Sequence, residues 1–298
     1  MKFRLGVSAL LLGVLLGVGA VAEGPPPFSG TRALAHVRAL VALGPRPPGS
    51  EGIRKARAYL RQQLRQAGVA VEELKFIAQT PRGPVSMSNL VARIPGKHTD
   101  IVILAGHYDT LDTRRVPNFV GANDGGSSAA VLLELARVLA ARRNHLSIWI
   151  VFFDGEEALR QWSARDGLYG SRTLAERWRG ERVLPRIRAF ILLDMIGDRD
   201  LRLRRELNST PWLVKLVWNA ARDLGHAAHF SNQTLVLEDD HLPFLRAGVP
   251  AVDLIDYDYG PGNRYWHTAD DTLDKLSARS FQVIGEVVLE TLRRLEQR

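Results

Sequence analysis

The chain has 298 residues, of which 46% are hydrophobic and 24% are charged, and this composition is typical of a globular protein with enough apolar side chains for a core. It excludes collagen-like, coiled-coil and intrinsically disordered chains. The sequence has no cysteine, which excludes a lipoprotein anchor, a disulfide framework and thiolate metal sites. Any metal must therefore be bound by His, Asp or Glu.

Residues 1–22 have the pattern of a Sec-type signal peptide. Two cations in "MKFR" precede the apolar run "LGVSALLLGVLLGVGAVA", which ends in a small-x-small cleavage site, Ala20-Val21-Ala22. The alternative is an uncleaved membrane anchor, because this run is close to the minimum length for a membrane span. We expect cleavage and export, with no stable membrane association afterwards. An exported chain without cysteines most simply indicates a bacterial protein, periplasmic or secreted.

The formal net charge is +8, and the chain after residue 22 carries 38 basic and 32 acidic residues, a net charge of +6. A basic balance can mark a nucleic-acid-binding surface. Here the arginines are scattered along helical patterns such as "RKARAYLRQQLRQ" and do not cluster with aromatic residues. We therefore expect no nucleic-acid partner. The sequence leaves the oligomeric state open.

The first part of the chain after the signal segment has two helical patterns and then two strand patterns. The helices are expected at 31–44 and 50–68, and each is closed by a glycine. Apolar and polar residues alternate at 69–80 and 88–96, which is the period of strands.

From residue 101 onward, continuous apolar runs alternate with helical patterns. The strands are expected at 101–106, 146–154, 189–197 and 249–256, and the helices at 127–143, 170–178, 210–225 and 278–297. Strands that are buried on both faces and alternate with helices indicate an α/β fold. We predict a three-layer sandwich, with a central mixed, mostly parallel sheet flanked by helices, in a single domain over residues 23–298.

In such a sheet the ligand site lies beyond the carboxyl ends of the strands, and here those ends carry residues that can bind a metal. They are His107 and Asp109, Asp124 in the next loop, Glu156 and Glu157 in "FFDGEE", Asp194 in "LLDMIGD", and His267 beyond the last strand. Each alone has a structural explanation, such as a helix cap, a core histidine or a solvated loop. Five segments that each bring a carboxylate or an imidazole to one sheet edge instead favour a cation site. Two histidines and three carboxylates suit catalytic zinc, and Asp109 can orient the His107 ring through a hydrogen bond.

Six motifs follow one another along the chain: "GHYDT", "GANDGGSS", "FFDGEEA", "LYGSR", "LLDMIGD" and "WHTADDT". This series resembles the zinc-dependent aminopeptidase superfamily, and more closely its glutaminyl cyclase branch. The resemblance covers nearly the whole chain after the signal segment, from "GPRPPGS" to "WHTADDTLDKLS". It implies a zinc exopeptidase-like fold and a glutaminyl-peptide cyclotransferase, which converts the N-terminal Gln of peptide or protein substrates to pyroglutamate and releases ammonia.

The resemblance also implies a role for individual residues. It implies one zinc ion held by Asp124, Glu157 and His267, with Glu156 as the general acid and base. It further implies Asp194 and Asp239 as the hydrogen-bonded carboxylate partners of Glu156.

The segment after the glutamate pair separates the two branches of the superfamily. In the dizinc aminopeptidases that this chain resembles, a Gly-Leu-x-Gly-Ser turn follows the pair almost at once, whereas here nine residues, "ALRQWSARD", come between. This insertion carries Trp162, and Trp266 directly precedes His267. Two indoles beside a polar site can form apolar walls with an N–H donor for a small substrate. The resemblance to the cyclases implies that Trp162, Trp266 and Leu237 line the substrate pocket.

A dizinc aminopeptidase is the alternative function. A second zinc would bind His107 and Asp194, with Asp124 bridging the two metals, and Glu156 would activate water to attack the first peptide bond. Asp253 stands where the animal cyclases have a histidine, and this extra acid can raise the pKa of a neighbour or attract a second metal. A third possibility, a non-catalytic binding domain on the same scaffold, predicts lost ligands, and all of the ligands are present.

Overall fold

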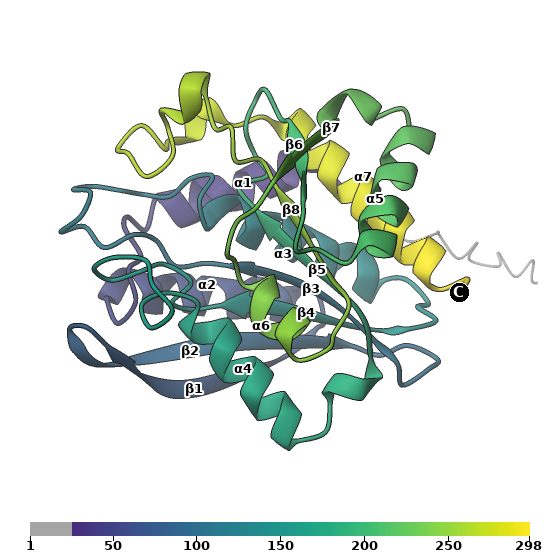
Figure 1. The fold of residues 1–298 in the computed structure, drawn as a ribbon, viewed down its shortest axis with the longest axis horizontal. Coiled ribbons are helices and arrows are strands. Elements are labelled where there is room, and N and C mark those ends of the chain that lie inside the picture. The colour runs from purple at the N-terminus through teal and green to yellow at the C-terminus, as the bar shows by residue number, and fades with distance from the viewer. Residues whose placement is uncertain (1–25) are drawn as a thin grey trace, which may run out of the picture.

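The computed structural model describes residues 26–298, so the predicted signal peptide and its cleavage site lie outside the described residues. A six-stranded sheet forms the centre, in the order β1-β2-β4-β3-β5-β8 (Figure 1). Its strands are β1 (Ala70–Thr80), β2 (Gly83–Ile94), β3 (Ile101–His107), β4 (Ser147–Phe153), β5 (Ile187–Asp194) and β8 (Ala251–Ile255). Neighbours among β4, β3, β5 and β8 pair in parallel, and β2 pairs antiparallel with both β1 and β4. The predicted mixed, mostly parallel sheet is confirmed.

The burial of the strands follows their sequence patterns. All seven residues of β3 and all five of β8 are buried, because helices cover both faces of the sheet. The edge strand β1 alternates and stays partly exposed. β2 begins five residues before the predicted start at residue 88, because it pairs with β1 along its full length, from Thr80 opposite Gly83 to Ala70 opposite Arg93.

Helices form the two outer layers (Figure 1). The larger cluster of buried apolar side chains lies between one face of the sheet and five helices: α1 (Gly30–Val41), α2 (Glu51–Gln66), α3 (Gly126–Ala140), α5 (Pro211–Asp223) and α7 (Ala278–Leu295). A second cluster lies on the other face, under α4 (Tyr169–Gly180) and α6 (His241–Arg246). The predicted three-layer sandwich is therefore confirmed.

Some short elements are absent from the sequence prediction. β6 (Leu203–Glu206) and β7 (Phe230–Leu235) form a separate parallel pair, and they were missed because they are short and partly polar. The six-residue α6 was missed for the same reason. The remaining turns are η1 (Leu184–Arg186), η2 (Ala227–His229), η3 (Pro261–Asn263) and η4 (Leu273–Lys275).

This topology places one edge of the sheet at the candidate site. β3, β4, β5 and β8 run in the same direction, so their carboxyl ends and the loops that follow them meet at that edge. Among residues 26–298, no helix combines the length and the apolar character needed to cross a membrane.

Candidate metal centre and substrate pocket

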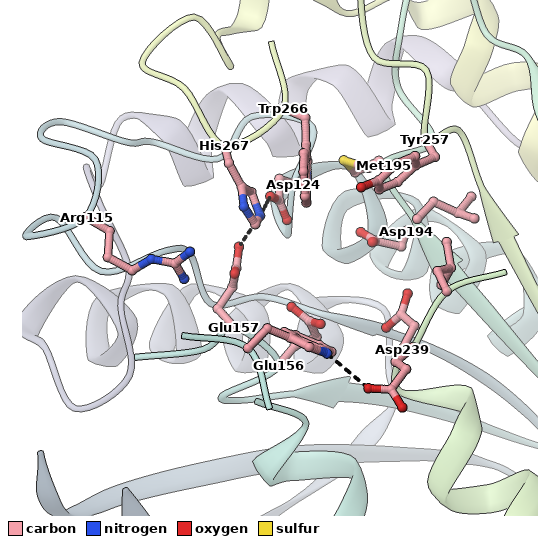
Figure 2. Close-up of a pocket in the computed structure, with 14 residues that line it drawn as sticks. Arg115, Asp124, Glu156, Glu157, Asp194, Met195, Asp239, Tyr257, Trp266 and His267 are labelled. Atoms are coloured by element: carbon pink, nitrogen blue, oxygen red, sulfur yellow. Dashed lines mark hydrogen bonds and ion pairs between the residues drawn. The ribbon is translucent and has the colours of Figure 1, made fainter. Parts of the chain in front are cut away.

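Asp124, Glu157 and His267 come together beyond the carboxyl ends of β3, β4 and β8 (Figure 2). Nε2 of His267 lies 3.2 Å from Oδ2 of Asp124 and 3.4 Å from Oε1 of Glu157. Both carboxylates are buried, and among the described residues neither of these two oxygens has a well-aligned hydrogen bond; the N–H of a protonated His267 is the one donor group close to both. Two buried carboxylates side by side are costly without a compensating positive charge, which a protonated His267 or a bound metal ion supplies.

The spacing of these three atoms fits zinc. Tetrahedral zinc has bonds of about 2.0–2.1 Å to nitrogen and oxygen, which separates neighbouring ligand atoms by about 3.3 Å. The separations of 3.2 and 3.4 Å match this value. The structure therefore brings together the three ligands that the resemblance implied, and they form a candidate metal site.

A second group of possible ligands lies on the other side of Asp124. Nε2 of His107 lies 3.2 Å from Oδ1 of Asp124 and 3.2 Å from Oδ1 of Asp194. The spacing again suits tetrahedral zinc, and Asp124 faces both groups with different oxygens. A protonated His107 also satisfies these contacts: burial lowers its pKa, but hydrogen bonds to Asp109, Asp124 and Asp194 raise the pKa well above its ordinary value.

The glutamate pair follows a turn whose backbone conformation favours glycine. Gly155 has a φ of +73°, and a Cβ there would lie 2.5 Å from Sδ of Met87, so the chain turns sharply after β4. Adjacent side chains then point in different directions. Glu157 faces His267, whereas Oε2 of Glu156 lies 4.0 Å from Nδ1 of His107.

Asp109 fixes the backbone of this pair. Its Oδ1 and Oδ2 accept hydrogen bonds from the N–H groups of Glu156 and Glu157, at 3.1 and 3.2 Å. Oδ1 also lies 3.4 Å from Nδ1 of His107, which is the contact expected from the sequence. The contacts with the glutamates were not predicted, because they join residues 47 and 48 positions apart in the chain.

Glu156 is surrounded by other acids. Burial raises the pKa of Glu156 well above its ordinary value; His107 lowers it, and Glu157, Asp239 and Asp240 raise it further. Its side chain points toward the pocket from the same side as Asp239 (Figure 2). A carboxylate with a raised pKa is a stronger base, so it can accept a proton during a reaction and return it.

Asp239 and Asp253 extend the acidic cluster into the interior. Burial raises the pKa of Asp239, and the carboxylates of Asp253, Asp194 and Asp240 raise it further. Asp253 is wholly buried, and neither of its carboxylate oxygens has a hydrogen-bond partner in the described residues. Its nearest basic group is Nδ1 of His241, at 3.9 Å. Asp253 therefore belongs to the buried acidic cluster that includes Asp239.

A cavity of about 360 Å³ opens beside the metal ligands and Glu156. Apolar and aromatic side chains form much of its wall, and they include Trp162, Met195, Leu237, Ile255, Tyr257 and Trp266. Trp266 stacks on His267, with 4.1 Å between the ring centres. The three pocket residues expected from the resemblance all line this cavity. Met195, Ile255 and Tyr257 were missed, although Ile255 is the last residue of β8, Tyr257 lies two residues beyond it, and Met195 directly follows β5.

The nine-residue insertion is closed by a single carboxylate. Asp166 accepts hydrogen bonds from the N–H groups of Leu159, Arg160 and Gln161, at 2.8 to 3.0 Å, and from the Tyr169 hydroxyl. This ring of bonds holds the loop that carries Trp162 against the pocket. The sequence pattern did not reveal Asp166, because its partners are backbone groups of its own loop.

Asp271 and Arg46 form hydrogen bonds with the backbone of the loop between β3 and α3, which carries Asp124. Asp271 accepts hydrogen bonds from the N–H groups of Asn123 and Asp124 and from the Tyr259 hydroxyl. Arg46 is fully buried and donates to three backbone carbonyls in the loop that follows β3. Both residues stand in the motifs "WHTADDT" and "GPRPPGS", which is the only sequence signal for them.

The comparisons with known proteins place the chain in a family. The sequence matches the model of peptidase family M28 over residues 89–292. A glutaminyl-peptide cyclotransferase of Boiga irregularis is 33% identical over 280 residues, which cover 82% of this chain and 75% of that protein.

Solved structures show the same relationship. The glutaminyl cyclase of an Acidobacteriales bacterium has a TM-score of 0.88 at 44% identity, covering 93% of this chain and 97% of that one. A Zn-dependent exopeptidase from Parabacteroides distasonis has a TM-score of 0.82 at 27% identity, covering 92% and 100%.

Fold and site together define the scaffold of a metal-dependent exopeptidase. The identities to the Acidobacteriales cyclase, 44%, and to the Boiga irregularis cyclotransferase, 33%, exceed the 27% to the Zn-dependent exopeptidase. The chain belongs to peptidase family M28 and, within it, to the glutaminyl cyclases.

Proposed function

We propose that this protein is a glutaminyl-peptide cyclotransferase, which converts the N-terminal Gln of a peptide to pyroglutamate and releases ammonia. The observation that carries the proposal is the cavity in which Glu156 and the ligand group Asp124–Glu157–His267 face a wall that includes Trp162 from the insertion. The volume of about 360 Å³ lies near the lower end for ligand pockets. It suits one amino-acid side chain and its α-amine.

Zinc is the proposed cofactor, held by Asp124, Glu157 and His267. When bound, it would act as a Lewis acid that polarises the γ-carbonyl of the substrate. The zinc-like spacing of Nε2 of His267 from the two buried carboxylate oxygens, neither of which has a well-aligned hydrogen bond among the described residues, supports this assignment. We propose one zinc ion per chain.

Glu156 would move the proton in this reaction. The α-amine of the substrate attacks the carbonyl carbon of the side-chain amide of the same residue, so the carboxylate of Glu156 accepts a proton from nitrogen as the C–N bond forms. The same carboxyl group then returns a proton to the departing ammonia. Because nucleophile and electrophile belong to one residue, the pocket has to fold the side chain and hold the amine near Glu156.

Asp194 and Asp239 would keep Glu156 suited to this task. Their carboxyl groups line the same cavity as Glu156, and Asp239 is among the acids that raise the pKa of Glu156. A raised pKa makes the carboxylate of Glu156 a better acceptor for the proton of the attacking amine. The stacked rings of Trp266 and His267 would give one wall of the pocket a flat aromatic surface for the substrate to contact.

A dizinc aminopeptidase is the second candidate, and one observation favours it. His107 and Asp194 reach Asp124 at zinc-like spacing, so a second metal would find its ligands in place. In that reaction Glu156 would accept a proton from the attacking water, and the first peptide bond would break.

The proposal includes where the protein acts and on what. The signal-peptide pattern in residues 1–22 supports export to the periplasm or the medium, with peptides or proteins that have a free N-terminal Gln as substrates. The scattered arginines support the absence of a nucleic-acid partner.

Incubation of the purified zinc-loaded protein with a Gln-initiated and a Leu-initiated peptide tests the function. We expect loss of ammonia from the Gln peptide, with the peptide bonds intact by mass spectrometry, and no change in the Leu peptide. Release of free leucine, without loss of ammonia from the Gln peptide, would establish the peptidase instead. Two tightly bound zinc ions per chain would also support the aminopeptidase.

A further inference from the structure

Arg115 lies on the wall of the substrate cavity in the loop between β3 and α3. Its side chain is exposed. Figure 2 shows its guanidinium on the side of Glu157 and His267, across the pocket from Asp194 and Asp239. A cation therefore stands beside the entrance to a pocket whose interior is acidic.

The loop holds this guanidinium in place. The N–H of Arg115 donates to the carbonyl of Asp112 at 2.8 Å, and the carboxylate of Asp112 pairs with Arg82 and Arg114. Nη1 of Arg115 donates to the carbonyl of Ala158 at 3.0 Å, which ties the head group to the chain just after the glutamate pair. The other N–H groups of the guanidinium have no partner among the described residues and can donate to a ligand.

The charge of Arg115 is not neutralised within the described residues. Its only described side-chain hydrogen bond is to a carbonyl, and Glu157 on the same side is directed toward His267. The acid at the other rim, Glu238, is already engaged, by Nε1 of Trp162 at 3.2 Å and by Arg246 at 3.6 Å. The rim therefore offers one unpaired cation and one partly compensated acid.

We propose that Arg115 is a specificity-determining residue that favours Gln peptides with Asp or Glu at the second or third position. This inference rests on the proposed cyclase function. The buried acids attract the α-ammonium group of the substrate into the pocket. Each residue spans only about 3.5 Å, so the second and third residues of the peptide remain near the entrance, within reach of Arg115. A carboxylate there forms a charge-assisted hydrogen bond with the guanidinium. A lysine at the same position meets a like charge.

The test uses four amidated peptides, so that no terminal carboxylate competes: Gln-Glu-Ala-Ala, Gln-Ala-Glu-Ala, Gln-Lys-Ala-Ala and Gln-Ala-Lys-Ala. We measure kcat and KM for cyclisation by the zinc-loaded protein at low salt. For at least one position we expect the acidic peptide to have a kcat/KM about two- to fivefold above that of its lysine counterpart, because an exposed ion pair is weak. The difference should lie in KM and shrink as salt is added.

Arg115→Gln should abolish most of this preference, Arg115→Lys should retain part of it, and Arg115→Glu should reverse it. Arg114→Gln is the matched control: it removes the same charge one residue away, from a side chain that binds Asp112 and does not line the cavity. The control should keep the wild-type ratio of acidic to basic peptides.

Two outcomes would overturn the inference while leaving the cyclase function intact. One is cyclisation of all four peptides with no acidic preference in the wild-type protein, and the other is an equal effect of Arg114→Gln and Arg115→Gln on the ratio. If none of the four peptides loses ammonia, the proposed function itself fails, which separates the two ideas.

Discussion

The backbone N–H of Asp124 donates a 3.1 Å hydrogen bond to Oδ2 of Asp271. This bond joins a candidate metal ligand to a residue 147 positions later in the chain. Oδ1 of the same carboxylate accepts from Asn123 and from the Tyr259 hydroxyl, both at 2.8 Å. Asp271 therefore positions the loop that presents Asp124, and it does so from the segment that also carries His267.

We predict that Asp271→Asn lowers zinc affinity about 10- to 100-fold, which is the usual effect of losing a group that orients a ligand. The amide offers one acceptor oxygen where the carboxylate offers two, so at least one buried donor loses its partner. Zinc affinity is measured by competition with a chelator.

Asp270→Asn is the matched control for this prediction. It makes the same change of charge one residue away, at a side chain that is exposed. It should leave the affinity unchanged. Equal affinities in the two variants would show that Asp271 does not position the ligand.

We predict different consequences for the two adjacent glutamates. Glu156→Gln should keep the zinc and lower kcat about 10²- to 10⁴-fold, since the amide cannot carry the proton. Glu157→Gln should lose the zinc, because a neutral amide replaces an anionic ligand. Metal content after dialysis and single-turnover rates separate the two effects. Mild and equal losses in both variants would contradict the division of roles.

We predict that Trp162→Leu raises KM for Gln peptides about three- to tenfold, because the aromatic wall is lost, with little change in zinc content. Trp212→Leu is the control: Trp212 is 36% exposed, close to the 37% of Trp162, but it packs against Arg298 away from the substrate cavity. An unchanged KM in Trp162→Leu would show that the insertion does not form part of the binding site.

The sequence was sufficient for the main elements of the fold. Long apolar runs such as 101–106 could be recognised as buried strands, since helices on both faces demand apolar residues along the whole strand. β6 and β7 could not, because four and six partly polar residues carry too little periodicity. Their pairing depends on tertiary contacts that no local pattern records.

The site, like the fold, could be predicted only in part from the sequence. The ligands could be found because they follow the strands and form ordered motifs. Asp166 and Asp271 could not be assigned a role, because they act through backbone N–H groups, and any carboxylate can accept such bonds. Arg115 was missed because nothing in its local sequence distinguishes it from the arginine before it; only the fold shows which of the two lines the cavity.

The last prediction concerns Asp253, whose buried carboxylate has no hydrogen-bond partner among the described residues. Burial raises the pKa of Asp253 well above its ordinary value of 3.8, and Asp194, Glu206 and Asp240 raise it further. Between pH 3.8 and the raised pKa, the unfolded chain releases this proton while the folded protein keeps it. The folded state then binds more protons, so this residue lowers the free energy of unfolding as pH rises through that range.

Asp253→Asn removes the ionisation and keeps the size of the side chain. We therefore expect it to raise the free energy of unfolding at pH 7.5 by about 1–3 kcal/mol, and to raise it less at pH 4.5. Urea unfolding at pH 4.5, 6.0 and 7.5, with zinc held constant, measures the change, and Asp200→Asn serves as the exposed control. A variant that is no more stable than wild type at pH 7.5, or a gain that does not shrink toward pH 4.5, would show that Asp253 is not held protonated in the folded protein.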